Sequence, residues 1–269
     1  AIWEGKKEAL FIARDRMGIK PLYYYIQDKQ FAFSSELRSL MASGLPENSI
    51  NPTGLYHYLS FGHLSAPDTL IDSVRELKPG HYLWIDKDGY WEEKEYWKPL
   101  SENKILPAGP GIEEQVKTTL EEAIICRRVS DVPLGAFLSG GIDSSTVVGN
   151  LARASESPIT TLTIGFAEKE FDESEYSQEI ADRFKTNHYL LCLDGEELLR
   201  SLPSSLSAMD QPTMDGINTY LISRAAHEAG LKVALSGLGG DELFGGYPSF
   251  QLIPKLRKKW LKSFPRVLL

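Results

Sequence analysis

The strongest constraint on the fold of this chain is the alternation of strand-like and helix-like segments beyond residue 111. Short apolar runs typical of buried strands cover residues 134–138, 159–164, 188–193 and 232–235. Segments with helical periodicity cover residues 112–128, 144–154, 173–184 and 218–229. This alternation predicts an α/β fold, in which helices cover both faces of a parallel sheet. Such sheets bind ligands in the loops that follow the carboxyl ends of their strands.

The first hundred residues follow a different pattern. They are rich in aromatic residues and in short alternating runs, which are typical of antiparallel hairpins. Hairpin turns are predicted at residues 4–7, 27–30 and 86–89, and short helices are predicted after Ser35 and from Asn51-Pro52. We therefore expect three parts, which are an antiparallel, β-rich α+β region at 1–100, a Pro- and Gly-rich linker at 101–111 and the α/β region at 112–269.

Composition narrows the class of protein. The 269 residues are 42% hydrophobic, which is enough to bury a core and argues against disorder. No apolar run approaches the roughly 18 residues that a membrane span needs, and no signal-like segment opens the chain, so a cytoplasmic location is expected. The net charge of −8 argues against a nucleic acid or an anionic membrane as the main partner.

Two local features are expected to be structural. The basic stretch Lys255–Arg266 is interpreted as the solvated face of a terminal helix. Cys126 and Cys192 stand singly in apolar contexts, and we expect both to be buried, reduced thiols.

A glycine-rich loop after the strand at 134–138 has the parts of a phosphate site. It reads Leu138-Ser139-Gly140-Gly141-Ile142-Asp143-Ser144-Ser145 and leads into a helix. The glycines let backbone N–H groups approach a phosphate, the hydroxyls of Ser139, Ser144 and Ser145 add donors, and the helix N-terminus favours negative charge. The carboxylate of Asp143 could hold Mg²⁺ against the phosphates.

A second loop follows the strand at 232–235 and contains a second acidic residue. It reads Ser236-Gly237-Leu238-Gly239-Gly240-Asp241-Glu242-Leu243-Phe244-Gly245-Gly246-Tyr247. Because both loops begin with Ser-Gly at the ends of strands and each carries an acid, Asp143 and Asp241, they suit a triphosphate and a metal ion held between them.

Three other loop types do not match. A Walker loop needs Gly-Lys-Ser/Thr, and the only Gly-Lys pair, Gly5-Lys6, lies in a predicted hairpin turn. A serine-hydrolase elbow around Ser139 would need glycine where Phe137 stands. A dinucleotide fingerprint in the second loop would need glycine where Glu242 stands.

Together the two loops resemble the synthetase domain of glutamine-hydrolysing asparagine synthetases, whose segments read S-G-G-(L/I)-D-S-S and S-G-E-G-x-D-E-x-x-G-G-Y. The resemblance implies an ATP-pyrophosphatase fold of the adenine nucleotide alpha-hydrolase type. It implies that ATP and Mg²⁺ are bound, with Mg²⁺ on Asp143 and Asp241 and adenosine near Leu138, Ile164, Ser236 and Gly237. It also implies that pyrophosphate lies on the first loop, at Ser139, Gly140, Gly141, Asp143, Ser144 and Ser145.

The N-terminal region adds a second resemblance. Residues 14–23, which read Arg-Asp-Arg-Met-Gly-Ile-Lys-Pro-Leu-Tyr, and Ser34-Ser35-Glu36 resemble the closing third of the family's glutaminase domain, which uses an N-terminal Cys nucleophile. Ala1 stands first here, so we expect a fragment that cannot hydrolyse glutamine. We interpret Arg14-Asp15 as a salt-bridged hairpin and Ser35-Glu36 as a helix cap.

The resemblance implies an ATP-dependent amide ligase that makes asparagine from aspartate, glutamine and ATP through an acyl-adenylate. It also allows a homodimer of the full-length protein. Two alternatives remain, which are an amidotransferase acting on another carboxylate and a non-catalytic nucleotide-binding module. Leu238 replaces the Glu of the family motif, and Asp215 falls near an Arg of bacterial members, so the acceptor stays open.

Overall fold

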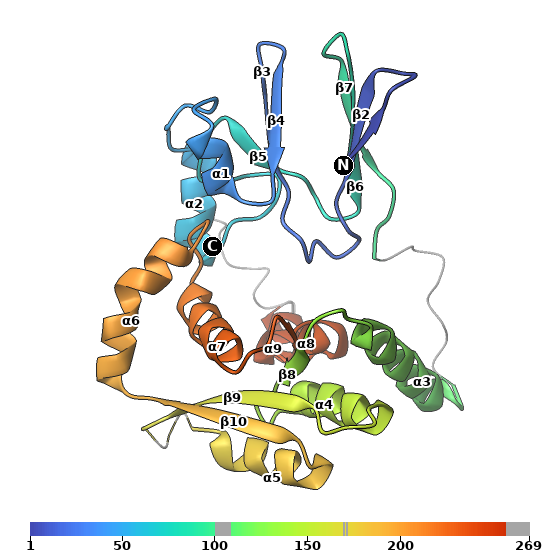
Figure 1. Ribbon diagram of the computed structural model, residues 1–269, viewed down its shortest axis with the longest axis vertical. Helices are drawn as coiled ribbons and strands as arrows, with labels where there is room; N and C mark the ends of the chain where they lie inside the picture. The colour runs from blue at the N-terminus through green and yellow to red at the C-terminus, as the bar shows by residue number, and fades with distance from the viewer. Residues whose placement is uncertain (100–108, 169, 171, 257–269) are drawn as a thin grey trace. The chain divides into compact units, whose positions relative to one another are not determined.

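The computed structural model describes residues 1–99, 109–168, 170 and 172–256 (Figure 1). The chain divides into two compact units. Unit 1 comprises Ala1–Ala108 together with Leu202–Tyr220, and unit 2 comprises Gly109–Ser201 and Leu221–Leu269. Most of the linker predicted at 101–111 and most of the basic stretch at 255–266 lie outside the described residues, so both stay predictions.

Unit 1 contains two antiparallel sheets. One has the order β1-β2-β6-β7, formed by Ile2–Glu4, Ala9–Ala13, His81–Asp86 and Trp91–Glu95. The other has the order β4-β3-β5, formed by Gln30–Ser34, Tyr23–Gln27 and Val74–Glu76. The three predicted hairpin turns are confirmed, because β1 pairs with β2, β3 with β4 and β6 with β7.

Both predicted short helices of unit 1 are present. Helix α2 (Pro52–Phe61) starts as expected, since the side chain of Asn51 accepts a hydrogen bond from the Thr53 amide at 3.0 Å. Helix α1 (Leu37–Ala42) begins after Glu36, but the predicted cap by Ser35-Glu36 is wrong, because Glu36 makes no side-chain capping bond. The capping oxygen comes from a residue far along the chain, Asp210.

Arg14 is buried and bonds entirely within unit 1. Arg14 forms a salt bridge, as predicted, but its partner is Glu76 at 2.8 Å and not Asp15, and its guanidinium also donates to three backbone carbonyls, those of Gly18, Lys20 and Leu77. The Asp15 carboxylate instead accepts the amides of Met17, Ile19 and Lys20. These nearby N–H groups satisfy the carboxylate locally, which leaves the guanidinium to cross to strand β5.

Unit 2 is built on a parallel sheet of order β10-β9-β8-β11, which confirms the predicted fold class. The strands are β8 (Leu134–Phe137), β9 (Thr160–Phe166), β10 (Asn187–Leu193) and β11 (Val233–Leu235). The helices are α3 (Ile112–Ile125), α4 (Ile142–Ala154), α5 (Ser174–Phe184), α6 (Gly195–Ala208), α7 (Gly216–Glu228), α8 (Gly240–Phe244) and α9 (Pro248–Leu256). The first parts of α6 and the last parts of α7 belong to unit 2, and the remainder of each belongs to unit 1.

Helices cover both faces of this sheet. On one face, Ala136 and Leu138 pack against a cluster from α3, α4 and α5 that contains Ile124, Val148, Leu151 and Ala181. On the other, Leu162 packs with Ala225 and Ala226 of α7, and Phe137 borders that cluster. Because neighbouring residues of a strand point to opposite faces, Phe137 and Leu138 mark the two sides of the sheet.

The expectation that both cysteines are buried is wrong. Cys126 and Cys192 are free and exposed. Cys126 opens the 3₁₀ turn Cys126–Arg128 after α3, and Cys192 lies on β10, the edge strand of the sheet, so neither position is enclosed by the core. Apolar sequence neighbours do not bury a residue when the element itself lies at an edge.

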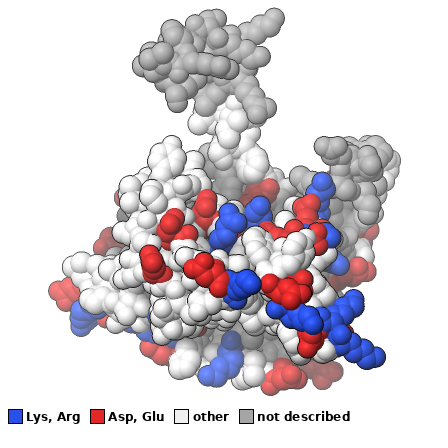
Figure 2. Space-filling model, turned by 90° about the horizontal axis from the view of Figure 1, so that it is seen from above, with Lys and Arg blue, Asp and Glu red and all other residues white. Residues whose placement is uncertain are grey.

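The surface seen in Figure 2 shows acidic and basic side chains interspersed over the face in view. Among the described helices, none combines the length and the apolar character needed to cross a membrane.

Candidate active site

The two predicted loops follow neighbouring strands of the parallel sheet. β11 pairs with β8, and the last residue pair, Leu235 with Ala136, lies close to the end of both strands. The chain runs from β8 outward to β9 and β10 and then returns to the other side of β8. The order of strands therefore reverses between β8 and β11, and α/β sheets bind ligands at such a switch point.

Glycines let the two loops touch. A Cβ on Gly240 would overlap the carboxylate of Asp143, and a Cβ on Gly237 would lie 2.7 Å from the backbone nitrogen of Ser144. A larger residue at Gly237 would push against backbone and force the loops apart, and one at Gly240 would displace the Asp143 side chain. The turn Gly237–Gly240 therefore rests directly on the first turn of α4, and Asp143 lies at the contact.

Hydrogen bonds inside the first loop fix its shape. The Ser139 amide donates to Ser144 Oγ at 3.1 Å, and Ser144 Oγ donates to the Gly141 carbonyl at 3.2 Å. Ser139 Oγ lies 3.0 Å from the same Ser144 oxygen. Gly140 has a φ of +72°, and a Cβ there would lie 2.6 Å from Tyr176 Cβ. The Ser144 hydroxyl thus serves the loop itself.

Other polar groups of the loops have no protein partner. Gly141 caps α4 without a side chain, and within the described residues the amides of Ile142 and Asp143 meet no acceptor. Ser145 Oγ is buried, and nothing in the described part of the chain bonds to it. The carboxylates of Asp143 and Asp241 likewise form no hydrogen bond or ion pair with any described residue. The two amides and the two carboxylates are available to a ligand, and the Ser145 hydroxyl is a buried donor that no described group satisfies.

Tyr247 lies close to the acidic residues of the two loops. Its hydroxyl donates to Glu242 Oε1 at 2.9 Å. That hydrogen bond, then burial, and then the charges of Glu242, Asp241 and Asp143 raise the pKa of the Tyr247 phenol. Asp241 directly follows Gly240, whose Cβ position overlaps the Asp143 carboxylate, so the two predicted metal ligands lie in the same region of unit 2.

The residues present fit a magnesium ion bound together with phosphates. Mg²⁺ usually takes one or two carboxylates and completes its shell with water and substrate phosphates. Two carboxylates without protein partners meet this requirement. Within the described ranges, no group of three or more His, Cys, Asp or Glu side chains is arranged to hold a metal alone.

The predicted adenosine residues differ in their surroundings. Leu138 is buried, its amide donates to the Leu162 carbonyl at 2.8 Å, and its carbonyl accepts from Thr163 Oγ1. Ser236 Oγ accepts from the Leu238 amide at 3.1 Å, so this hydroxyl shapes the second loop. Ile164 lies half-buried on β9, two strands away from β11.

Two tyrosines that were not predicted as site residues, Tyr247 and Tyr176, support the loops. Tyr247 closes the second loop through Glu242, and Tyr176 of α5 packs under Gly140. The aromatic residue directly after Gly245-Gly246 was the available signal for the first. Nothing in the local sequence indicates the second, because Tyr176 lies on a different helix from the one that the first loop leads into.

Two family models match the chain. The model described as asparagine synthase matches residues 115–268, which is more than half of the chain. The model described as a glutamine amidotransferase domain matches residues 1–97.

Curated relatives agree with these matches. A protein of Methanocaldococcus jannaschii, provisionally named a glutamine-hydrolysing asparagine synthetase, is 36% identical over 99% of this chain and 52% of its own length. Asparagine synthetase 1 of Bacillus subtilis is 33% identical over 99% of this chain and 43% of its own. Amidase chry2 of Gibberella zeae is 30% identical over 93% of this chain and 40% of its own length. The chain thus spans about half the length of the curated relatives that it matches, and it belongs to the asparagine synthase family.

Proposed function

We propose that unit 2 carries the ATP site of an amide-forming ligase. The observation that supports this most is the contact of Asp143 with Gly240 at the reversal of strand order. It gathers unpartnered amides, a free hydroxyl on Ser145 and two carboxylates in one region. In this proposal the triphosphate lies between the two loops, and adenosine lies near Leu138, Ile164, Ser236 and Gly237.

The proposed reaction begins when the acceptor carboxylate attacks the α-phosphate of ATP and pyrophosphate leaves. Ammonia then displaces AMP from the acyl-adenylate and forms the amide. The amides at the start of α4 and the Ser145 hydroxyl would bind the departing pyrophosphate and stabilise its charge. Asp143 and Asp241 would hold Mg²⁺, which supplies further charge neutralisation at the phosphates.

The nitrogen source in this proposal is glutamine. The match of residues 1–97 to a glutamine amidotransferase domain supports an arrangement in which one part of the intact protein releases ammonia and unit 2 uses it. The names of the two asparagine synthetases above support L-aspartate as the first acceptor to test.

The second candidate function is an amidotransferase that acts on a carboxylate other than aspartate, and Leu238 favours it. Its side chain is 86% exposed in the loop that touches Asp143, and an aliphatic side chain can neither take a proton nor hold an ammonium ion. Asp215 supports the alternative less. Its carboxylate accepts from Asn218 Nδ2 and Thr219 Oγ1, both at 3.3 Å, so it serves the start of α7.

Exchange of labelled pyrophosphate into ATP tests the site in the full-length gene product. Asp143→Asn keeps the size of the side chain and removes its charge, so exchange should fall by about a hundredfold or more. Asp131→Asn changes an exposed aspartate of unit 2 outside the loops and should leave the rate unchanged. Exchange at the parent rate in Asp143→Asn would show that this carboxylate does not bind the metal.

An acceptor screen with ammonia and ATP separates the two candidates for the acceptor. If Leu238 marks a changed acceptor, aspartate should be a poor substrate and Leu238→Glu should improve it. Efficient asparagine formation by the parent, unchanged by Leu238→Glu, would exclude the second candidate.

A further inference from the structure

Residues 202–220 join the two regions that the family models match separately. By sequence they lie within residues 115–268, which match asparagine synthase. By packing they belong to unit 1. The segment comprises the end of α6, a connection and the start of α7. We call it the strap.

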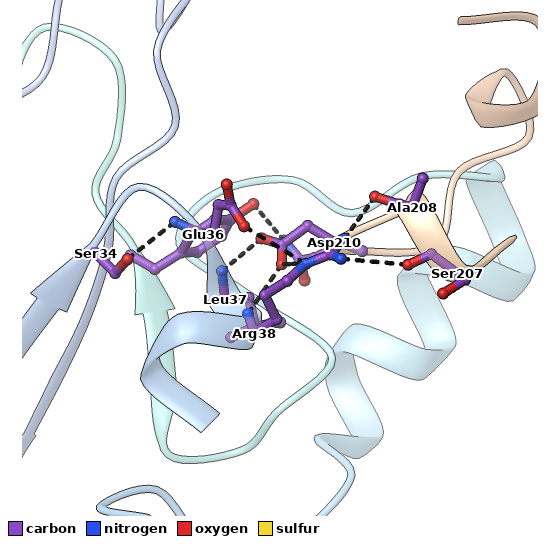
Figure 3. A network of polar contacts seen from close by, with 9 residues as sticks. Ser34, Glu36, Leu37, Arg38, Ser207, Ala208 and Asp210 are labelled. Carbon is purple, nitrogen blue, oxygen red and sulfur yellow. Dashed lines mark hydrogen bonds and ion pairs between the residues drawn. The ribbon is translucent and has the colours of Figure 1, made fainter. Parts of the chain in front are cut away.

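Asp210 of the strap caps helix α1 (Figure 3). Its carboxylate accepts hydrogen bonds from the amides of Leu37 at 2.5 Å and Arg38 at 2.9 Å. The residue at the helix's own cap position, Glu36, makes no side-chain capping bond and instead pairs with Arg38 at 3.6 Å. The first amides of α1 therefore depend on a carboxylate supplied by a residue 172 positions after Arg38.

Arg38 returns the contact to the strap. Its guanidinium donates to Asp210 Oδ1 at 3.3 Å, to the Ser207 carbonyl at 3.3 Å and to the Ala208 carbonyl at 2.5 Å. These carbonyls lie at the C-terminal end of α6, where a cation is favoured by the helix dipole. Figure 3 shows the guanidinium pointing between Asp210 and these carbonyls. Asp210 of the strap thus satisfies the first amides of α1, and Arg38 of α1 satisfies the last carbonyls of α6.

Two further contacts fasten the strap. Gln211 Oε1 accepts from the Leu70 amide at 3.1 Å, and its Nε2 donates to the Tyr23 hydroxyl at 3.3 Å. The Met214 amide donates to the Gly62 carbonyl at 3.0 Å, at the end of α2. The strap is therefore bonded to α1, α2 and β3 of unit 1.

The strap continues into buried parts of unit 2. Helix α7 runs without a break to Glu228, and Leu221, its first residue in unit 2, is fully buried. Within unit 2, Arg224 of α7 pairs with Glu197 of α6 at 2.9 Å and donates to Ser201 Oγ at 3.1 Å. The two helices that carry the strap are thus fixed to each other at their far ends.

We propose that the strap couples α1 to α6 and α7, and that Asp210 is its main fastening. Loss of the Asp210 bonds then frees the start of α1 and, in the same event, the strap residues of α6 and α7. The proposal holds whatever unit 2 binds, so it does not depend on the proposed function.

Hydrogen exchange of the whole chain, followed by mass spectrometry, tests the coupling. In Asp210→Ala, peptides with the Leu37 and Arg38 amides should exchange about tenfold faster, in line with the loss of a helix cap. Peptides from 202–208 and 216–220 should accelerate with them, and β9 should keep the parent rate. Glu36→Ala is the matched control, because its side chain caps nothing and only pairs with Arg38 across 3.6 Å at the surface, so it should leave the Leu37 and Arg38 amides at the parent rate.

Two other variants decide the matter if Asp210→Ala does not fold. Asp210→Asn keeps an acceptor oxygen and should preserve most protection of α1. Arg38→Met should accelerate peptides from 202–208 while the Leu37 amide stays protected. The coupling is overturned if Asp210→Ala or Arg38→Met leaves 202–208 at the parent rate, or if Glu36→Ala reproduces the effect on α1.

Discussion

The Arg14 cluster of unit 1 and the two glycine-rich loops of unit 2 use polar residues in opposite ways. Arg14 is 8% exposed and its guanidinium has four partners inside unit 1. At the loops, Ser145 Oγ is buried without a partner in the described part of the chain. Asp143, unlike Asp15, accepts no amide from the described residues.

Whether a buried polar group has hydrogen-bond partners in the protein distinguishes structural from ligand-binding residues better than the residue type does. A buried polar group with all its partners stabilises the fold, and its loss leaves other groups unpaired. A buried polar group without a partner destabilises the fold, by about 1–3 kcal/mol, and is a candidate for completion by a ligand. Substitutions in the Arg14 cluster should therefore change stability, and substitutions in the loops should change binding.

The largest effect should come from Arg14→Met. It leaves Glu76 buried without its ion pair and three carbonyls without a donor, which should lower the free energy of unfolding by about 3–5 kcal/mol. Denaturant unfolding measures the change. Arg16→Met, at an exposed position, should alter it by less than about 0.5 kcal/mol. A loss near that of the control would mean that the Arg14 bonds contribute little to stability.

Gly240→Ala should be the most damaging small change in the loops. Its Cβ would overlap the Asp143 carboxylate, so that carboxylate must move, and displacing a proposed metal ligand should weaken Mg-ATP binding by on the order of a hundredfold. Calorimetric titration with Mg-ATP gives the affinity. Gly195→Ala adds the same methyl group where nothing lies within 4 Å and should bind as the parent does. Equal Mg-ATP affinities for the two variants would show that the contact between the loops is not part of the ATP site.

Tyr24 makes unit 1 sensitive to alkaline pH. Burial, followed by the charge of Glu93 and a hydrogen bond to it, raises the pKa of Tyr24 to about 12 from 10.0. Between these values the unfolded chain loses the phenolic proton while the folded chain keeps it. The free energy of unfolding should therefore fall by about 2–3 kcal/mol as pH rises from 10 to 12.

The control for this pH dependence is a second tyrosine. Tyr24→Phe removes the titrating group and should remove that part of the decline, whereas Tyr90→Phe, at an exposed tyrosine, should retain it. A decline of the same size in Tyr24→Phe would assign the alkaline loss to other groups. The measurement is denaturant unfolding at several pH values above 9.

The adjacent serines of the first loop provide the smallest and most direct comparison. Ser144→Ala removes three loop contacts and should lower the free energy of unfolding by about 1 kcal/mol. Ser145→Ala removes a buried hydroxyl without a described partner, so stability should not fall, while Mg-ATP affinity falls. The reverse pattern would mean that the internal hydrogen bonds do not predict which serine meets the ligand.

Local patterns predicted most of the elements but not the long-range contacts. The turn at Gln27–Gln30 and the start of α2 at Asn51-Pro52 depend on neighbouring residues, and both are confirmed. Helix α6 was not predicted, because Pro203 lies in its interior and proline usually ends a helix. The meeting of the loops follows from the parallel topology. The roles of their residues stay a proposal.

The cap on α1 shows the limit of such patterns. Its oxygen comes from Asp210, and no local rule connects that residue to Leu37. The same holds for the pairing of Arg14 with Glu76, since the guanidinium passes over the adjacent Asp15. Both contacts require knowledge of which distant strands and helices become neighbours.

The position of Asp210 also bears on how chains of this family can be recombined. Recombination of two genes near residue 100, between the two family matches, would take α1 from one parent and its capping residue, Asp210, from the other. In a hybrid whose later half lacks an acceptor at position 210, the first amides of α1 would have no capping carboxylate, and Arg38 would keep only the exposed Glu36 as an ion-pair partner. A functional hybrid would therefore need residues 1–100 and the strap, residues 202–220, from the same parent.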